Sequence, residues 1–210
     1  QDGRDAYIQY NFETDQTKIR AKETESGNVN FKELNQIQNV VKGQPLAQKM
    51  PAERGKAGKT LTGRYMEAKN GKDIKIPLGK NVELDKDGVT VLASMAGRVL
   101  YEEGRINVEP VLELDSIGIK TGNIDFLGSV IVKGNVDDGY ELKATGNIEI
   151  SGTVGKSIIQ SERGDIIVTQ GIFGHDEGVV RSGKSVWAKF IQSAKVEVEE
   201  FCIVSDSIMN

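Results

Sequence analysis

The second half of the chain carries a repeating pattern of apolar and polar positions. Five times after residue 121, a turn-forming pair precedes a short run in which apolar and polar residues alternate. The copies begin at Gly122, Gly146, Gly164, Lys184 and Glu200, with spacings of 24, 18, 20 and 16 residues. A period this short, rich in β-branched residues and without helical spacing, indicates stacked β-coils. The pattern therefore predicts a parallel β-solenoid of about five coils over residues 113–210.

Alternation assigns the side chains of the five copies to columns, because residues i and i+2 of a strand share a face. Two columns are predicted to point inward: Ile124, Ile148, Ile166, Val186 and Cys202, and Phe126, Ile150, Val168, Ala188 and Val204. The outward column between them is Asp125, Glu149, Ile167, Trp187 and Ile203.

The outward column changes character along the solenoid. Its first two members are charged, whereas Ile167, Trp187 and Ile203 are apolar. Aligned on a stacked solenoid, these three form an exposed ridge, which is a candidate contact for a second copy of the chain or for a partner protein. The alternative is that a further C-terminal segment or the N-terminal domain covers the ridge.

Residues 1–112 are expected to form a small, mostly-β domain. Short alternating runs predict strands at residues 6–10 and 17–21, and Asp87-Gly88 is typical of a hairpin turn. Apolar positions spaced at helical intervals predict one short helix over residues 31–41. The glycine-rich stretch 51–73 is expected to be an extended loop with short strands and few core residues.

Charge is concentrated in this first domain. Residues 42–80 carry ten basic and three acidic side chains, a net charge of +7, while the rest of the chain carries −11. The candidate basic patch consists of Lys42, Lys49, Arg54, Lys56, Lys59 and Arg64. Clustered Lys and Arg are the footprint of phosphate binding, but Tyr65 is the only aromatic residue available for base stacking in this segment. A solvated loop, or a surface for an acidic partner, is therefore favoured over a nucleic-acid site.

The sequence contains few of the cysteine and histidine side chains that often form catalytic or metal-binding sites. Cys202 is the only cysteine, which excludes an intrachain disulfide and a thiolate metal cage and fits a reducing cytoplasm. His175 is the only histidine, and with Asp176 and Glu177 it is interpreted as a solvated loop rather than a metal site. Residues 55–60 resemble a phosphate-binding loop but have two residues between the glycines where four are required, which favours a basic turn. We assign no catalytic, cofactor-binding or metal residues, although sequence alone leaves carboxylate pairs open.

Two features concern the ends of the chain and its relation to membranes. No apolar run approaches the roughly 18 residues of a membrane-spanning helix, and no charged-then-apolar leader is present. The chain begins at Gln1 and ends at Asn210 without a breaker or cap. This beginning and this end predict a piece of a longer protein, with a solenoid truncated at its C-terminal end.

Several long strings resemble the bacterial flagellar assembly protein A family. They are residues 35–47, 55–60, 71–82, 121–130 and 187–191. The resemblance implies a cytoplasmic bacterial protein linked to flagellar assembly. It also implies a right-handed parallel β-helix similar to those of bactofilins and the C-terminal domain of the division inhibitor MinC. No catalytic residues are established for the family, so none is carried over.

Two functional hypotheses follow. The first is a non-enzymatic scaffold for protein partners of the flagellar assembly system, active as a homo-oligomer or with a partner, and involved in assembly or in polar placement. The alternative is a module that binds a ligand or nucleic acid through the basic segment 42–80. Binding to mixed oligonucleotides across a salt series distinguishes the two, because phosphate contacts give a steep salt dependence.

Overall fold

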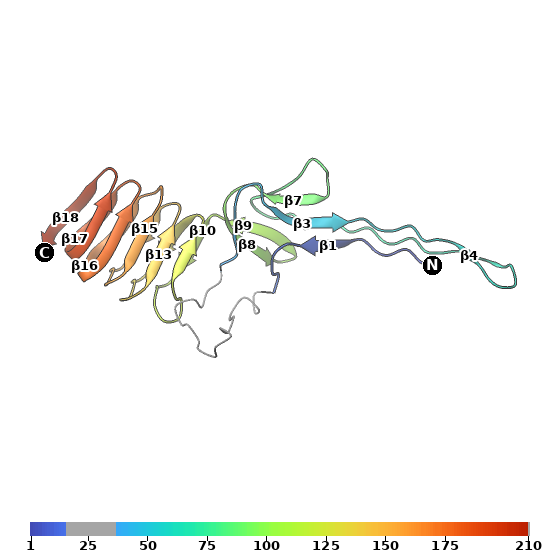
Figure 1. Cartoon of the computed structure of the whole chain (residues 1–210), viewed down its shortest axis with the longest axis horizontal. Helices are drawn as coiled ribbons and strands as arrows, with labels where there is room; N and C mark the ends of the chain where they lie inside the picture. Colours follow the sequence, from blue (N-terminus) through green and yellow to red (C-terminus); the bar gives the residue numbers. More distant parts are fainter. Residues whose placement is uncertain (16–36, 210) are drawn as a thin grey trace. The chain divides into compact units, whose positions relative to one another are not determined.

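The computed structural model describes residues 1–15 and 37–209, and every regular element in this part of the chain is a β-strand (Figure 1). It contains two compact units. The first consists of residues 1–14, 42–95 and 100–108, and the described residues of the second are 15, 37–41, 96–99 and 109–209. The expectation of a mostly-β chain is confirmed.

The first unit is built on a four-stranded antiparallel sheet. Its order is β1 (Tyr7–Tyr10), β3 (Pro45–Met50), β7 (Thr90–Ala93) and β6 (Val82–Leu84). Apolar side chains of β3 and β7 form its core: Leu46, Ala47, Val91 and Ala93 are buried. A separate sheet has the order β2 (Asn39–Val40), β8 (Gly97–Glu102) and β9 (Arg105–Glu109).

The turn between β6 and β7 is the predicted hairpin. Gly88 has a φ of 70°, a left-handed conformation that suits glycine. The Asp87 carboxylate accepts hydrogen bonds from the amides of Val89 at 2.8 Å and Thr90 at 2.9 Å. These bonds lower the pKa of Asp87 below its ordinary value, with the Thr90 hydroxyl making the largest contribution. The Asp87-Gly88 signal is therefore confirmed.

The strand and helix predictions near the N-terminus have different outcomes. The strand at residues 6–10 is confirmed as β1, whereas residues 17–21 lie outside the described residues. Most of the predicted helix, residues 31–36, also lies outside them. Its last residues form a strand instead, because Asn39 and Val40 pair with Arg98 and Gly97 of β8. The helix prediction is wrong for this end of the segment.

The second unit is a parallel β-solenoid of about six turns. Strands of one face stack in the order β10 (Val111–Leu114), β12 (Ser129–Val132), β14 (Ile148–Ile150), β16 (Ile166–Ser182), β17 (Val186–Val198) and β18 (Cys202–Met209). A second face stacks β11 (Ile124–Phe126), β13 (Glu141–Ala144), β15 (Ile158–Ser161) and the C-terminal parts of β16 and β17. Single parallel bridges from Ile117 through Val136 and Val154 to Ile172 mark a third side.

The register corrects the composition of the predicted columns. Ile124 lies opposite Leu142, and Phe126 opposite Ala144, on the second face. Ile148 instead stacks between Val130 and Ile166 on the first face. The first two sequence copies therefore belong to different faces. The step of 24 residues between them is one coil of 18 residues plus the six residues that lead from the second face to the first face of the next coil. From Ile148 and Ile150 onward the predicted columns are confirmed.

The interior of the solenoid is apolar and closed, except at its last coil. Phe126, Ile148, Ile150 and Ile166 are fully buried. Cys202 follows Val186 in the same column but is exposed, so the expectation of a buried cysteine is wrong. Within the described residues β18 pairs only with β17, so Cys202 lacks a neighbouring coil on one side.

Polar corners connect successive coils. A side-chain oxygen of one coil accepts a hydrogen bond from the backbone amide that lies 18 residues later, in the next coil. The accepting and donating residues are Asn123 and Glu141, Asn135 and Thr153, and Asn147 and Asp165. Backbone amides at corners fall outside the regular ladder, and these bonds satisfy them. The corners thus explain why Asn and Asp recur at the repeat period.

Candidate interaction surfaces

The apolar ridge follows directly from the parallel register of the first face. Ile167 lies opposite Trp187, and Trp187 opposite Ile203. Ile167 and Ile203 are 39% and 47% exposed, and Trp187 is half-buried. Asp125 lies on the second face and is not part of this column. The three apolar residues are therefore aligned as predicted and accessible, whereas their role as a contact surface stays a prediction.

In the earlier coils, the same outward column also contains charged residues. Glu149 precedes Ile167, Ile131 precedes Glu149, and Glu113 precedes Ile131. Lys133 forms an ion pair with Glu113 at 3.0 Å between Nζ and Oε2. The ridge is thus the apolar end of a column whose other end carries charge.

The first unit extends into an arm made of three chain segments (Figure 1): residues 1–6, 51–59 and 65–73. The hydrogen bonds run around the three segments in a circle. The Gly3 amide donates to the Lys69 carbonyl at 2.9 Å, the Gly71 amide to Glu53 at 3.0 Å, and the Glu53 amide to Arg4 at 2.9 Å. A flat sheet cannot close such a circle, so the three segments surround a common axis.

Small residues occupy the axis of the arm. Gly3, Gly55 and Gly71 are partly buried, and a Cβ at any of them would collide with backbone atoms of another segment. Partly or fully buried positions recur every third residue, at Gly3 and Ala6, Ala52 and Gly55, and Ala68 and Gly71. A period of three, with glycine where chains crowd an axis, is typical of bundled polyproline II segments such as collagen.

A short hairpin closes the outer end of the arm. It consists of β4 (Gly58–Lys59) and β5 (Tyr65–Met66), with Lys59 opposite Tyr65 and Gly58 opposite Met66. Thr60 fixes the loop: its amide donates to the Arg64 carbonyl at 2.9 Å, and its hydroxyl accepts from the Arg64 amide at 3.0 Å. We call residues 56–66 the arm tip. Sequence reasoning expected a basic turn within residues 55–60, and that segment leads into this hairpin.

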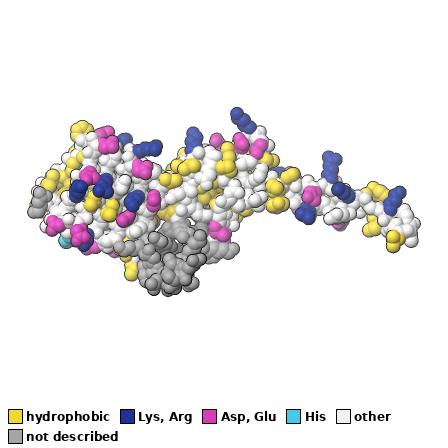
Figure 2. Space-filling view, in the orientation of Figure 1, with side chains coloured by type: hydrophobic (Ala, Val, Ile, Leu, Met, Phe, Trp, Pro, Cys, Tyr) yellow, Lys and Arg dark blue, Asp and Glu magenta, His cyan; other side chains and the backbone are white. Residues whose placement is uncertain are grey.

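Three large apolar side chains are exposed at the arm tip. Leu61 is completely exposed, and Tyr65 and Met66 are 63% and 58% exposed. Figure 2 shows hydrophobic and basic side chains together at this end of the unit. The sequence analysis did not identify Leu61 and Met66 as candidate residues. The sign that could have pointed to Leu61 is that it is an apolar residue in a glycine-rich, basic turn, outside any run of alternating apolar and polar residues.

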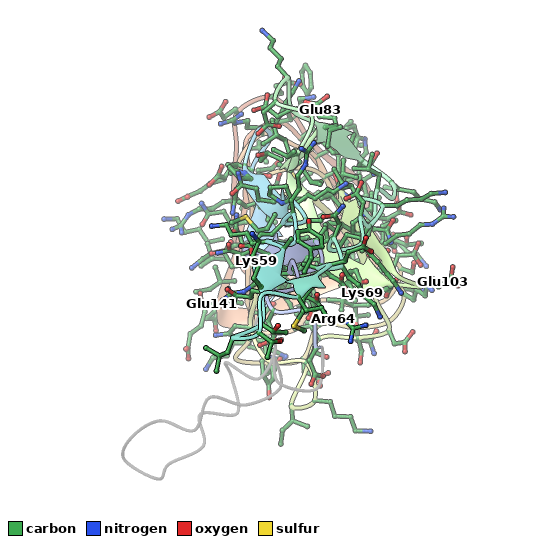
Figure 3. The ribbon with its side chains drawn as sticks, turned by 90° about the vertical axis from the view of Figure 1, so that its right-hand side faces the viewer. Lys59, Arg64, Lys69, Glu83, Glu103 and Glu141 are labelled. Carbon is green, nitrogen blue, oxygen red and sulfur yellow. The ribbon has the colours of Figure 1, made fainter. Side chains whose placement is uncertain are left out.

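The predicted basic patch divides into different environments. Lys56, Lys59 and Arg64 lie exposed on the arm tip, and Figure 3 labels Lys59 and Arg64. Arg54 is exposed farther along the arm, and Lys42 lies outside it. Lys49 lies in β3, with its side chain only 18% exposed and its Nζ 2.7 Å from Asp73. The Lys49 hydrogen bond lowers the pKa of Asp73, so this lysine is part of a structural ion pair.

The His175 loop forms an exposed bulge inside β16. His175 and Asp176 adopt φ angles of 47° and 64°, the left-handed conformation in which such residues are uncommon but tolerated. Glu177 forms an ion pair with Lys156 at 2.7 Å. In the part of the chain that the structure describes, no group of three or more His, Cys, Asp or Glu side chains could hold a metal ion.

Two open hollows lie on the solenoid surface, with volumes of about 400 and 510 Å³. Ser161 and Ser182 line the first, together with Arg181 and Glu197. Their hydroxyls bind main-chain atoms: Ser161 donates to the Gly146 carbonyl at 2.8 Å, and Ser182 to Gly164 at 2.8 Å. Arg181 holds Glu197 at 2.6 Å. These four side chains therefore bind one another or the backbone.

Comparisons with known proteins find two models of one family, which divide the chain between residues 104 and 110. Residues 110–210 match the family model described as the Flagellar Assembly Protein A beta solenoid domain. Residues 1–104 match the model of the N-terminal region of the same family. No curated protein and no solved structure gave a match. No helix in the described residues is long and apolar enough to cross a membrane.

Proposed function

Because the chain belongs to the Flagellar Assembly Protein A family, we propose that it acts in the cytoplasm as a non-enzymatic scaffold for flagellar assembly or polar placement. In this role the solenoid is a stiff body that presents a fixed surface to a protein of the flagellar assembly system. The function is binding and positioning, without a chemical step.

The alignment of Ile167, Trp187 and Ile203 is the observation that supports this proposal most directly. Three accessible apolar side chains on successive coils make a continuous strip at a spacing set by the parallel stacking of strands, about 4.8 Å per coil. Tryptophan is frequent among residues that dominate the energy of protein interfaces. A partner, or a second copy of the chain, would bury this strip.

The stacked architecture provides rigidity for such a surface. Each inner coil is held on both sides by backbone ladders, and fully buried residues such as Ile148 and Ile166 fill the interior. In repeat structures each unit contacts its neighbours, which creates extended binding surfaces. The ridge is therefore held in place by the same contacts that stabilise the fold.

The test combines Ile167→Ser and Trp187→Ala in the full-length protein of a flagellated bacterium. We expect the number or position of flagella to change and self-association or capture of flagellar proteins to weaken, while the purified variant keeps its circular dichroism spectrum. Val111→Ser with Ile119→Ser is the matched control, because both residues are exposed apolar side chains of the same unit outside the ridge. Normal flagellation with the ridge variant would contradict the proposal, and unfolding would place Trp187 in the core.

A further inference from the structure

We propose that the arm tip is a membrane-surface anchor that inserts Leu61, Tyr65 and Met66 into the interface of an anionic lipid bilayer. This inference concerns a different unit from the ridge and does not depend on it. It rests on the exposure of the apolar side chains, on the charge around them and on the construction of the arm.

Exposure is the first observation. Leu61 has no protein environment at all, and its neighbours across the hairpin are more than half exposed. The Thr60 bonds and the left-handed Gly63, with a φ of 80°, define the turn that leaves Leu61 exposed. A leucine at the apex of an ordered turn contributes nothing to the packing of this unit, whereas burial in an acyl boundary would recover its full transfer free energy.

Charge is the second observation. The arm tip carries Lys56, Lys59 and Arg64 and no acidic residue, a charge of +3, and the next acid along the chain is Glu67. Lys59 and Arg64 flank the apolar apex from the two sides of the hairpin. Basic side chains around an apolar tip complement a bilayer, because their charges meet anionic headgroups while the apolar side chains enter the layer below.

The construction of the arm is the third observation. Gly58 lies six positions after Ala52, which gives the three-segment part a length of about 19 Å at 3.1 Å per residue. This part is held by backbone hydrogen bonds around Gly3, Gly55 and Gly71 and not by a hydrophobic core. The tip can therefore reach a surface while the sheet at the base of the arm stays in water.

A membrane explains these observations better than nucleic acid does. Proteins that hold single strands combine cationic grooves with aromatic platforms for base stacking. The arm tip has one tyrosine, and its apex is an aliphatic side chain that neither stacks on bases nor bonds to phosphate. Anionic lipid is the surface that uses both the leucine and the cations.

The experiment measures flotation of the 210-residue chain with vesicles of phosphatidylcholine alone, or of phosphatidylcholine with about one-third phosphatidylglycerol. We expect binding to the anionic vesicles only, and weaker binding as salt rises. Leu61→Ser should weaken binding roughly ten- to hundredfold, as expected for withdrawing one buried leucine. Lys59→Gln should weaken it about fivefold, the typical effect of one basic residue at an anionic surface.

Matched controls come from a solenoid corner that offers the same side-chain types next to each other. Ile119 and Lys120 are both exposed, so Ile119→Ser and Lys120→Gln remove an apolar and a basic side chain from elsewhere on the chain and should leave binding unchanged. Leu61→Trp should retain binding, because tryptophan suits the membrane interface.

Three results would overturn the proposal. The first is absence of binding to anionic vesicles, and the second is equal binding by wild type and Leu61→Ser. The third is binding that the Ile119 and Lys120 variants weaken as much as the tip variants do. In a parallel titration, tight binding of mixed oligonucleotides that Leu61→Ser leaves intact would assign the cations to nucleic acid instead.

Discussion

Ile148 illustrates how a single residue is fixed by the coils on either side of it. It is fully buried between Val130 and Ile166, so an aspartate there would place a carboxylate in an apolar interior. We expect Ile148→Asp to lower the free energy of unfolding by several kcal/mol, as measured by urea or thermal unfolding. The neighbouring Glu149→Ala, on the exposed face, is the control and should change stability little. Equal melting of the two variants would show that the register of β14 is wrong.

Cys202 gives a second test at the residue scale. Its side chain is exposed, yet partial desolvation raises the pKa of its thiol above the ordinary value. We therefore expect a thiol reagent to label the native protein completely, but more slowly near neutral pH than in denaturant, because the folded state holds less thiolate. The two rates should converge as pH rises above both pKa values. A native thiol that stays unlabelled would contradict the exposure of β18.

The raised pKa of Cys202 also determines how this residue makes the stability of the fold depend on pH. A raised pKa in the folded state means that folding favours the neutral thiol. The small stabilisation from this preference is present below the unfolded pKa and is lost as pH rises through the folded pKa. Acid should therefore leave the contribution of Cys202 intact, while alkaline conditions remove it.

At the scale of an element, the three-segment arm depends on glycine at specific positions. A methyl group at Gly55 would meet the Lys69 backbone, whereas one at Gly58 would meet nothing within 4 Å. We expect Gly55→Ala to separate the segments and to accelerate tryptic cleavage after Lys56 and Lys59. Gly58→Ala is the matched control, three residues away in the same segment, and should be cleaved like the wild type. Equal cleavage of both variants would show that the segments do not share a crowded axis.

The arm also shows which elements the sequence could not predict. Its period of three is visible only when residues 1–6, 51–59 and 65–73 are placed together, and the chain gives no local sign that they meet. Alternation of period two, in contrast, is local, and it correctly predicted β1. The turn pair Asp87-Gly88 is equally local, and it correctly predicted the hairpin between β6 and β7. The end of the predicted helix failed because strand pairing of Asn39 and Val40 with β8 overrides a short helical spacing.

For the whole molecule, the repeat pattern predicted a solenoid but not the membership of every column. A coil places β-strands or bridges on three sides, so similar turn-and-strand motifs occur at different points of one coil. The copies at Gly122 and Gly146 look alike, although one leads into the second face and the other into the first. The alignment of the ridge residues was predicted because the three repeat copies that contain them all lie on the first face. The arm tip was missed although Leu61 stands in a glycine-rich basic turn, because only the structure shows that this side chain is fully exposed.

A solenoid stabilised by contacts between neighbouring coils should lose stability unevenly when core residues are truncated. Ile150 is fully buried between Val132 and Val168. Val204 is half-buried, and among the described residues it stacks on Ala188 alone. We expect Ile150→Ala to lower the free energy of unfolding by about 2–5 kcal/mol, and Val204→Ala by about 1 kcal/mol or less, in urea titrations of the same chain. Hydrogen exchange should agree, with the amides of β14 protected far longer than those of β18. Equal costs at the two positions would mean that the last coil is held as firmly as the inner ones. The stability of the solenoid would then come from the cooperativity of the whole stack and not from contacts between adjacent coils.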